Sequence, residues 1–293
     1  MDIMILGGSG QLGKTVFREL QDDFEIVCLN KSEVSLINKA EVIEAVCEFN
    51  PKFIVNCAAY TKVELAEIEK KKANAVNYEG VKNVSEAAKL NDASLIHFST
   101  DYVFDGKKKS PYLETDKANP INEYGSSKLR GENHIVRNIE NFFIFRVSGI
   151  FSEYGDNFVK SMMRLKDKDE LTVVSDQIMK PSSATFIANF LKINLSKNNF
   201  ALSNAGLYNL SSSGPQISWH NFAEIIFKEM LAQKLIIKIP RITPILSKDY
   251  KSSVLRPEFS VLSNNKVKEK FIFDNANFKE NLKIEIKRIY QAL

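Results

Sequence analysis

The chain has 293 residues, of which 44% are hydrophobic. That is enough to bury the core of one large α/β domain, or of a large domain with a smaller lobe. The 40 Lys and Arg against 36 Asp and Glu leave a net charge of only +4, too small an excess to indicate nucleic acid binding. No apolar run reaches membrane-spanning length and no basic-then-apolar leader opens the sequence. We therefore expect a cytoplasmic protein that binds neither nucleic acid nor membranes.

Three cysteines, Cys28, Cys47 and Cys57, lie in apolar stretches without metal-ligand spacing. Buried thiols in a reducing compartment are the expectation. The three histidines form no cluster with cysteines or carboxylates in the sequence, so no metal site is predicted.

Strand-like and helix-like segments alternate through the first half of the chain, as a parallel doubly wound sheet requires. The expected strands are the apolar runs 2–6, 25–29, 53–56, 94–98 and 142–147. Helical periodicity predicts helices over residues 14–20, 40–49, 73–90 and 124–136.

Beyond residue 150 this rhythm is lost. Short strand-like segments at 172–174 and 207–210 lie among helical segments at 184–193, 219–231 and 278–293. We expect residues 1–150 to form a dinucleotide-binding domain, completed by parts of the second half. Residues 151–293 should form a smaller mixed α/β lobe over the strand ends, where a substrate would be held.

A glycine-rich turn joins the first strand to the first helix, with the sequence Gly7-Gly8-Ser9-Gly10-Gln11-Leu12-Gly13. Glycines let the backbone turn tightly and approach a pyrophosphate, whose charge then lies at the helix N-terminus. The position between a strand and a helix makes this a good dinucleotide-binding signal. The fold class predicted is therefore α/β, a doubly wound parallel (Rossmann) sheet with a smaller C-terminal substrate-binding lobe.

Three residues, Thr100, Tyr124 and Lys128, carry a hydroxyl, a phenol and an ammonium that together could transfer a proton. Thr100 ends the fourth apolar run, and Tyr124 and Lys128 lie four residues apart on a predicted helix. A phenol has a reference pKa of about 10, and an ammonium one helical turn away favours its ionised form. Thr100 would add a hydrogen bond to a carbonyl or alcohol oxygen.

At these residues the chain resembles the extended short-chain dehydrogenase/reductases, and within them the dTDP-4-dehydrorhamnose reductases, over nearly its whole length. The string Thr100-Asp101-Tyr102-Val103-Phe104-Asp105-Gly106 is specific to that subgroup. Further matching segments are 10–13, 56–61, 111–116, 124–132, 155–159, 176–177, 218–223 and 256–257.

The resemblance implies an NAD(P)H-dependent oxidoreductase that reduces the C4 keto group of a 6-deoxy-4-keto sugar nucleotide. The product implied is dTDP-rhamnose, for surface polysaccharide. Tyr124 would protonate the C4 oxygen, Thr100 would hydrogen-bond to it, and Lys128 would hold the nicotinamide ribose and lower the tyrosine pKa. The substrate residues would be Thr100, Asp101 and Arg256. The cofactor-binding residues would be Gly7, Gly10, Gln11, Leu12, Asn30, Lys31, Ala59, Tyr60, Thr61, Tyr124 and Lys128.

Related sugar-nucleotide reactions fit the residues less well. Dehydratases of the same superfamily carry Asp then Glu after the threonine, whereas Asp101 is followed by Tyr102. Epimerase-reductases use a Cys and a His as bases, and neither Cys57 nor His134 is well placed for that role. Arg256 has two open interpretations, a loop anchor or a group facing the substrate diphosphate.

The cofactor is expected to be NADPH, with NADH the alternative. The second strand ends in Asn30-Lys31, without the carboxylate that binds the NAD ribose, and Lys31 could pair with a 2′-phosphate. One departure leaves the exact sugar open: Gly149 stands where the family carries a substrate-contacting Trp.

Two further alternatives remain. One is a reductase of a different 4-keto sugar nucleotide. The other is a non-catalytic NADP-binding regulatory subunit, like those that relatives of this fold provide for methionine adenosyltransferase. A homodimer is also left open.

Overall fold

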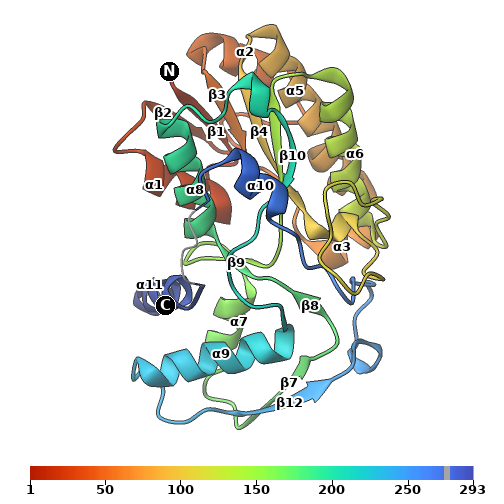
Figure 1. Cartoon of the computed structure of the whole chain (residues 1–293), viewed down its shortest axis with the longest axis vertical. Coiled ribbons are helices and arrows are strands. Elements are labelled where there is room, and N and C mark those ends of the chain that lie inside the picture. The colour runs from red at the N-terminus through yellow and green to blue at the C-terminus, as the bar shows by residue number, and fades with distance from the viewer. Residues whose placement is uncertain (274–277, 293) are drawn as a thin grey trace.

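The computed structural model describes residues 1–273 and 278–292. A six-stranded, all-parallel sheet forms its main body, with strand order β10-β5-β4-β3-β1-β2. Figure 1 shows this sheet with its helices in the upper part of the view and a smaller lobe below it. The predicted doubly wound parallel sheet is confirmed.

The strands of the main sheet are β1 (Ile3–Leu6), β2 (Ile26–Leu29), β3 (Phe53–Asn56), β4 (Ser94–Thr100), β5 (Phe142–Val147) and β10 (Gly206–Asn209). The helices that cover it are α1 (Gln11–Leu20), α2 (Lys39–Phe49), α5 (Val81–Leu90), α6 (Glu123–Asn138) and α8 (Ala184–Ser196). Shorter helical pieces on the same body are α3 (Val63–Ile68), α4 (Lys70–Asn74), the π-helical turn η1 (Ala75–Gly80), the 3₁₀ turn η2 (Asp101–Val103) and α10 (Asn265–Lys270).

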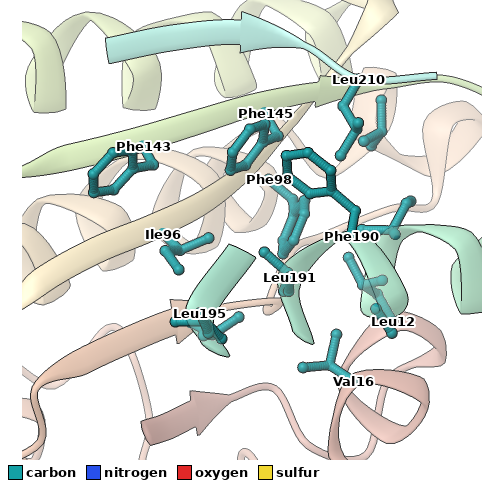
Figure 2. Close-up of a cluster of buried hydrophobic side chains, with 14 of the residues drawn as sticks. Leu12, Val16, Ile96, Phe98, Phe143, Phe145, Phe190, Leu191, Leu195 and Leu210 are labelled. Atoms are coloured by element: carbon teal, nitrogen blue, oxygen red, sulfur yellow. The ribbon is translucent and has the colours of Figure 1, made fainter. Parts of the chain in front are cut away.

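Alternation along the strands divides the core between the two faces of the sheet. Ile3 and Ile5 point toward α1 and α8, whereas Met4 and Leu6 point toward α2 and α5. On the first face, Phe143 and Phe145 pack with the apolar side of α8, as Figure 2 shows. Both faces are dry because every strand residue of β1, β4 and β5 is buried, as expected for a parallel sheet with helices on both sides.

The smaller lobe has its own apolar cluster, which includes Phe151, Phe222, Phe227 and Ile286. Its helices are α7 (Phe158–Arg164), α9 (Trp219–Ala232) and α11 (Phe278–Ala292), with the short turns η3 (Leu202–Asn204) and η4 (Ser247–Asp249) elsewhere in the second half. Its strands pair two by two: β7 (Glu170–Val174) with β12 (Arg241–Ile245), β8 (Ile178–Met179) with β11 (Ile217–Ser218), and β6 (Ile150–Phe151) with β9 (Ser182–Ser183).

Two segments of the second half complete the main sheet rather than the lobe. The predicted short segment 207–210 corresponds to β10, which pairs in parallel with β5, and α8 packs against α1. A segment this short carries no local sign of its partner, because strand pairing depends on the register of a distant strand.

Three sequence-based expectations need correction or restriction. The long helix expected over 73–90 is interrupted by the wider η1 turn. Cys47 is exposed on α2, whereas Cys28 and Cys57 are half-buried, because position 47 falls on the outer side of its amphipathic helix. The helix expected to end at Leu293 is described as far as Ala292, and Leu293 lies outside the described residues.

Candidate active site

A cleft with a volume of about 1840 Å³ lies between the carboxyl edge of the main sheet and the smaller lobe. Ligands of doubly wound sheets bind at this edge, and a drug-sized ligand occupies roughly 300–1,000 Å³. The cleft therefore has room for two ligands side by side. Among the predicted site residues, those that line it are Gly7, Gly10, Gln11, Leu12, Lys31, Ala59, Tyr60, Thr61, Thr100, Asp101, Tyr124, Lys128 and Arg256.

The glycine turn has no space for side chains at its closest points. Gly7 has φ +85, and a Cβ there would lie 2.6 Å from the Ala58 backbone nitrogen. A Cβ on Gly13 would lie 2.3 Å from the Gly7 carbonyl oxygen. The turn delivers the N-terminus of α1 to the cleft wall with no side-chain cap on its first amide groups. Free amide groups and a bare backbone fit the pyrophosphate of a dinucleotide.

Gln11, the first residue of α1, joins this turn to the smaller lobe. Its Nε2 donates to the Ile150 carbonyl at 3.2 Å, and its Oε1 accepts from Asn157 Nδ2 at 2.9 Å. Gly155, at φ +62, lies against the Gln11 side chain. The two walls of the cleft are therefore joined at the end where the glycine turn lies.

The end of β2 differs from the expectation in two respects. Asn30 does not line the cleft, because its side-chain oxygen accepts from the Ser32 amide and hydroxyl and closes a local turn. No carboxylate was expected here, yet Glu33 folds back so that its Oε2 accepts from the Asn30 amide at 2.8 Å. Lys31, an exposed cation, lines the cleft, whereas Glu33, an exposed anion, lies beside the Asn30 turn and does not line it.

Helix α6 brings Tyr124 against the end of β4. Its N-cap Asn122 accepts from the Gly125 amide at 2.8 Å, and a Cβ on Gly125 would lie 2.1 Å from the Tyr102 carbonyl oxygen. The absence of that Cβ lets the helix approach η2 closely. As a result the Tyr124 ring meets the Tyr102 ring edge-on, 5.8 Å between centroids, and its hydroxyl lies near Thr100.

Burial raises the pKa of Tyr124 to about 12, against the nearby hydroxyl of Thr100, which lowers it. Lys128 makes no contribution to this shift in the protein without cofactor, so the lowering of the tyrosine pKa by Lys128 stays a prediction. The buried Lys128 nitrogen instead donates to the Phe98 carbonyl oxygen at 2.6 Å, and burial lowers the pKa of Lys128 to about 8. Tyr124 is accordingly a protonated phenol at neutral pH, ready to give a proton rather than to take one.

Asp101 lies beside Thr100 and is only 4% exposed. Its oxygens accept from Ser148 Oγ at 2.7 Å and from Thr100 Oγ1 at 3.2 Å, and Ser260 lies near enough to lower its pKa. Burial nevertheless raises the pKa of Asp101 to about 6. Ser148 and Ser260 were not predicted as site residues, although Ser148 directly follows β5 and so lies at the carboxyl edge where ligands bind.

Asn77, a buried residue on η1, hydrogen-bonds with backbone groups at the site. Its Oδ1 accepts from the Tyr60 amide at 2.8 Å, and its Nδ2 donates to the Tyr60 carbonyl and to Ser127 Oγ. Asn77 therefore holds the Ala59–Thr61 segment of the cleft wall against α6. The wider η1 turn marks this position, but a sequence pattern does not reveal such a turn.

Arg256 forms an ion pair with Glu64 of α3 across the mouth of the cleft, which favours its interpretation as a loop anchor. Gly149, where an aromatic was expected, has φ +53, and a Cβ there would lie 3.2 Å from both Met179 Sδ and Pro181 Cα. Met179 and Pro181 therefore close the position where the tryptophan is missing.

The residues of competing reactions are poorly placed. Cys57 lines the cleft, but burial raises the pKa of its thiol, so it stays protonated and offers no thiolate to act as a base. His134 does not line the cleft and contacts Tyr78 and Asn138 instead. In residues 1–273 and 278–292 no group of three or more His, Cys, Asp or Glu could hold a metal ion, and no helix of that part is long and apolar enough to cross a membrane.

The fold and the cleft together define a dinucleotide-dependent oxidoreductase of the short-chain dehydrogenase/reductase class. A family model described as RmlD substrate binding domain matches residues 1–291, and the chain belongs to this family.

Its relatives carry one name repeatedly. The chain is 38% identical over 286 residues to a dTDP-4-dehydrorhamnose reductase of Aggregatibacter actinomycetemcomitans, covering 96% of this chain and 97% of the relative. A dTDP-4-dehydrorhamnose reductase of Bacillus anthracis, solved with NADP, has a TM-score of 0.89 at 32% identity, covering 98% of this chain and 99% of that one. A Thermus thermophilus UDP-glucose 4-epimerase, at 18% identity and a TM-score of 0.77 over the full length of both chains, shares the fold. The resemblance expected from the motifs is confirmed.

Proposed function

We propose that the protein reduces the C4 keto group of dTDP-4-dehydrorhamnose to give dTDP-rhamnose for surface polysaccharide, with NADPH as the reductant. The observation that carries this proposal is the meeting of Thr100, Tyr124 and Lys128 in the cleft that also contains the glycine turn. The relative from Aggregatibacter is named for this reaction, and the Bacillus anthracis relative was solved with NADP.

The residues divide the work of a carbonyl reduction. Bound NADPH would supply the hydride. Tyr124 gives its phenolic proton to the carbonyl oxygen as negative charge develops there, and Thr100 donates a hydrogen bond to the same oxygen. The Thr100 oxygen accepts from the Tyr102 amide at 3.2 Å, so its own proton is directed away from the backbone, toward Asp101 or a substrate. Asp101 accepts hydrogen bonds from hydroxyl groups of the sugar, and Lys128 donates hydrogen bonds to the nicotinamide ribose.

Two other functions remain as outcomes of a test. A reductase of a different 4-keto sugar nucleotide would use the same proton donor. A regulatory NADP-binding subunit would need the glycine turn but not Tyr124, so the complete catalytic set favours an enzyme. A cytoplasmic location and a homodimer belong to the proposal as well, and the dimer is checked by light scattering of the purified protein.

The decisive experiment follows NADPH oxidation with dTDP-4-dehydro-6-deoxy-L-mannose generated in situ. We expect rapid turnover by the unaltered protein and a loss of at least a hundredfold in Tyr124→Phe, because general acid catalysis contributes about 10²–10⁴-fold. NADPH binding should survive in Tyr124→Phe. Full activity in that variant would refute the assignment of the proton donor. Tight NADPH binding without turnover by the unaltered protein would favour another sugar nucleotide or the regulatory function.

A further inference from the structure

His97, in the middle of β4, is fully buried behind the proposed catalytic lysine. Its Nδ1 lies 3.2 Å from Asn56 Nδ2, at the end of β3. Its Nε2 lies 3.5 Å from Lys128 Nζ. The imidazole therefore stands between an amide and an amine, and the position of its single proton decides what it offers to each of them.

Asn56 decides the tautomer. Its Oδ1 accepts from the Ala58 backbone amide at 3.1 Å. A backbone N–H can only donate, so the atom facing it must be the amide oxygen of Asn56 and not the nitrogen. The Asn56 amide therefore cannot be rotated, and Nδ2, which can only donate, faces His97. His97 Nδ1 must accept, so the ring is neutral and its proton lies on Nε2. Burial, with Lys128 nearby, also lowers the pKa of His97, in agreement with a neutral ring.

The Nε2–H group of that tautomer points at Lys128 Nζ. An ammonium has no lone pair to receive this hydrogen, whereas a neutral amine has one and can still donate to the Phe98 carbonyl. The other titratable groups that act on Lys128 are Glu132, on its own helix, and Cys57, after β3, and both favour the charged form. Burial outweighs them and lowers the pKa of Lys128 to about 8.

We propose that His97 is a positioning residue that acts through Lys128: held by Asn56 with its proton on Nε2, it favours the neutral amine and so makes Lys128 the group that returns a proton to Tyr124. The inference rests on the catalytic roles proposed above for Tyr124 and Lys128.

The proton balance of this step is simple. Tyr124 loses its phenolic proton to the carbonyl oxygen and becomes a phenolate. The Lys128 ammonium, one helical turn along the same helix, then gives a proton to that phenolate, directly or through a hydroxyl group between them. Tyr124 is again a phenol, Lys128 is a neutral amine, and the amine takes a proton from water before the next turnover. His97 itself gains and loses no proton.

The first test uses the unaltered protein and no substrate. Imidazole ¹⁵N resonances, assigned by comparison with His97→Gln, should show His97 with its proton on Nε2 and without titration between pH 5 and 9. His220, whose Nε2 faces the Ile242 carbonyl in the smaller lobe, serves as an internal reference. A proton on Nδ1, or an imidazolium, would overturn the proposal whether or not the protein proves to be a reductase.

The second test reverses the tautomer with an isosteric change. In Asn56→Asp the carboxylate can still accept from the Ala58 amide but now also accepts from His97 Nδ1–H, which leaves the Nε2 lone pair facing Lys128. We expect the Lys128 pKa, followed through its amine resonance, to rise by about one unit, and the basic limb of kcat to move to higher pH by the same amount. KM for NADPH should change little.

The negative charge that Asn56→Asp introduces must be separated from the effect of the tautomer. The same pKa shift is measured for Asn56→Asp in a His97→Gln background, where no imidazole can switch its proton. A larger shift with His97 present supports the proposal. Equal shifts in both backgrounds, in variants shown by circular dichroism to be folded, mean that His97 has a merely structural role.

Discussion

At the scale of single residues, Lys31 lines the cleft near the expected site of the adenosine ribose, and the anion Glu33 follows two positions along the chain. Lys31 can pair with a 2′-phosphate, whereas Glu33 repels it and can accept from a 2′-hydroxyl. The Glu33 carboxylate is held by the Asn30 amide, so it is placed before any ligand arrives. Discrimination between NADPH and NADH is therefore a balance between two side chains two positions apart.

We predict that Lys31→Ala weakens NADPH binding about tenfold and NADH binding much less, because one charge-assisted hydrogen bond is lost. Glu33→Gln is the matched variant and should strengthen NADPH binding relative to NADH. Dissociation constants from cofactor fluorescence check both effects. Equal weakening of the two cofactors in Lys31→Ala would exclude pairing with the phosphate.

Asp101 makes stability depend on pH in the unusual direction. Its pKa is raised from 3.8 to about 6 by burial, so the folded state binds more protons than the unfolded state between these values, and stability falls as pH rises through this window. The shift corresponds to about 3 kcal/mol.

We expect Asp101→Asn to remove that decline when the free energy of unfolding is measured by urea titration from pH 4 to pH 7. Asp105→Asn is the control with the opposite sign. The pKa of Asp105 is lowered, first by a hydrogen bond from the Lys107 amide, so its contribution is present at neutral pH and is lost on acidification. An unchanged pH dependence in Asp101→Asn would show that the carboxylate is stabilised as well in the fold as in water.

At the scale of elements, the orientation of α6 depends on a buried ion pair. Arg146 of β5 donates to both carboxylate oxygens of Glu132, at 2.7 Å from Nη2 and 3.0 Å from Nε. The guanidinium also lies over the Phe104 ring, 4.9 Å from its centroid. Because Glu132 lies one turn beyond Lys128 on α6, this pair holds the catalytic helix against the sheet.

Glu132→Gln should lower the free energy of unfolding by about 3–5 kcal/mol, since it leaves a buried guanidinium without its counter-charge. Glu123→Gln, which breaks the partly exposed pair with Arg130 on the same helix, should cost no more than about 1 kcal/mol. Urea denaturation measures both. A similar loss of unfolding free energy in the two variants would mean that burial does not strengthen the contribution of the Arg146–Glu132 pair to stability.

Sequence patterns predicted those features of the site that depend on neighbouring residues. The glycine turn, the end of β4 at Thr100 and the Tyr124–Lys128 spacing are all local, and the structure brings them to one cleft. The contacts of Asn77 with Tyr60, and of Asp101 with Ser148 and Ser260, join residues far apart in the chain. They depend on how elements pack, which periodicity and spacing do not encode.

At the scale of the whole molecule, the cleft exists only because two bodies are held at a defined separation. Gln11 and Asn157 join them at one end, and Arg256 and Glu64 join them at the other. A cofactor bound to the main sheet and a sugar bound to the smaller lobe must meet within about 3–3.5 Å to react. Together with other contacts between the bodies, such as the ion pair of Arg18 with Glu153, these two contacts influence the approach of the reactants.

Asn157→Ser tests this coupling. A serine can still cap α7, as Asn157 Oδ1 now does through the Lys160 amide, but it is too short to reach Gln11. Asn157 Nδ2 also donates to the Ser152 carbonyl at 2.7 Å, so we expect the free energy of unfolding to fall by about 1–2 kcal/mol. KM for NADPH should rise roughly threefold to tenfold through the loss of the hydrogen bond to Gln11. Steady-state kinetics beside thermal unfolding separate the two effects. Unchanged kinetics would show that the other contacts between the bodies suffice.

The place of β10 in the sheet has a consequence for the order in which the protein matures on the ribosome. When only residues 1–150 have emerged, strand β5, which is buried in the complete fold, still lacks its neighbour β10 on one side. Its apolar sequence Phe-Phe-Ile-Phe-Arg-Val then forms an exposed edge strand that can pair with other chains. The gap closes only when residues 206–209 leave the exit tunnel. Newly made chains therefore pass through a vulnerable interval of about sixty residues, in which a chaperone or slow translation would protect them from aggregation.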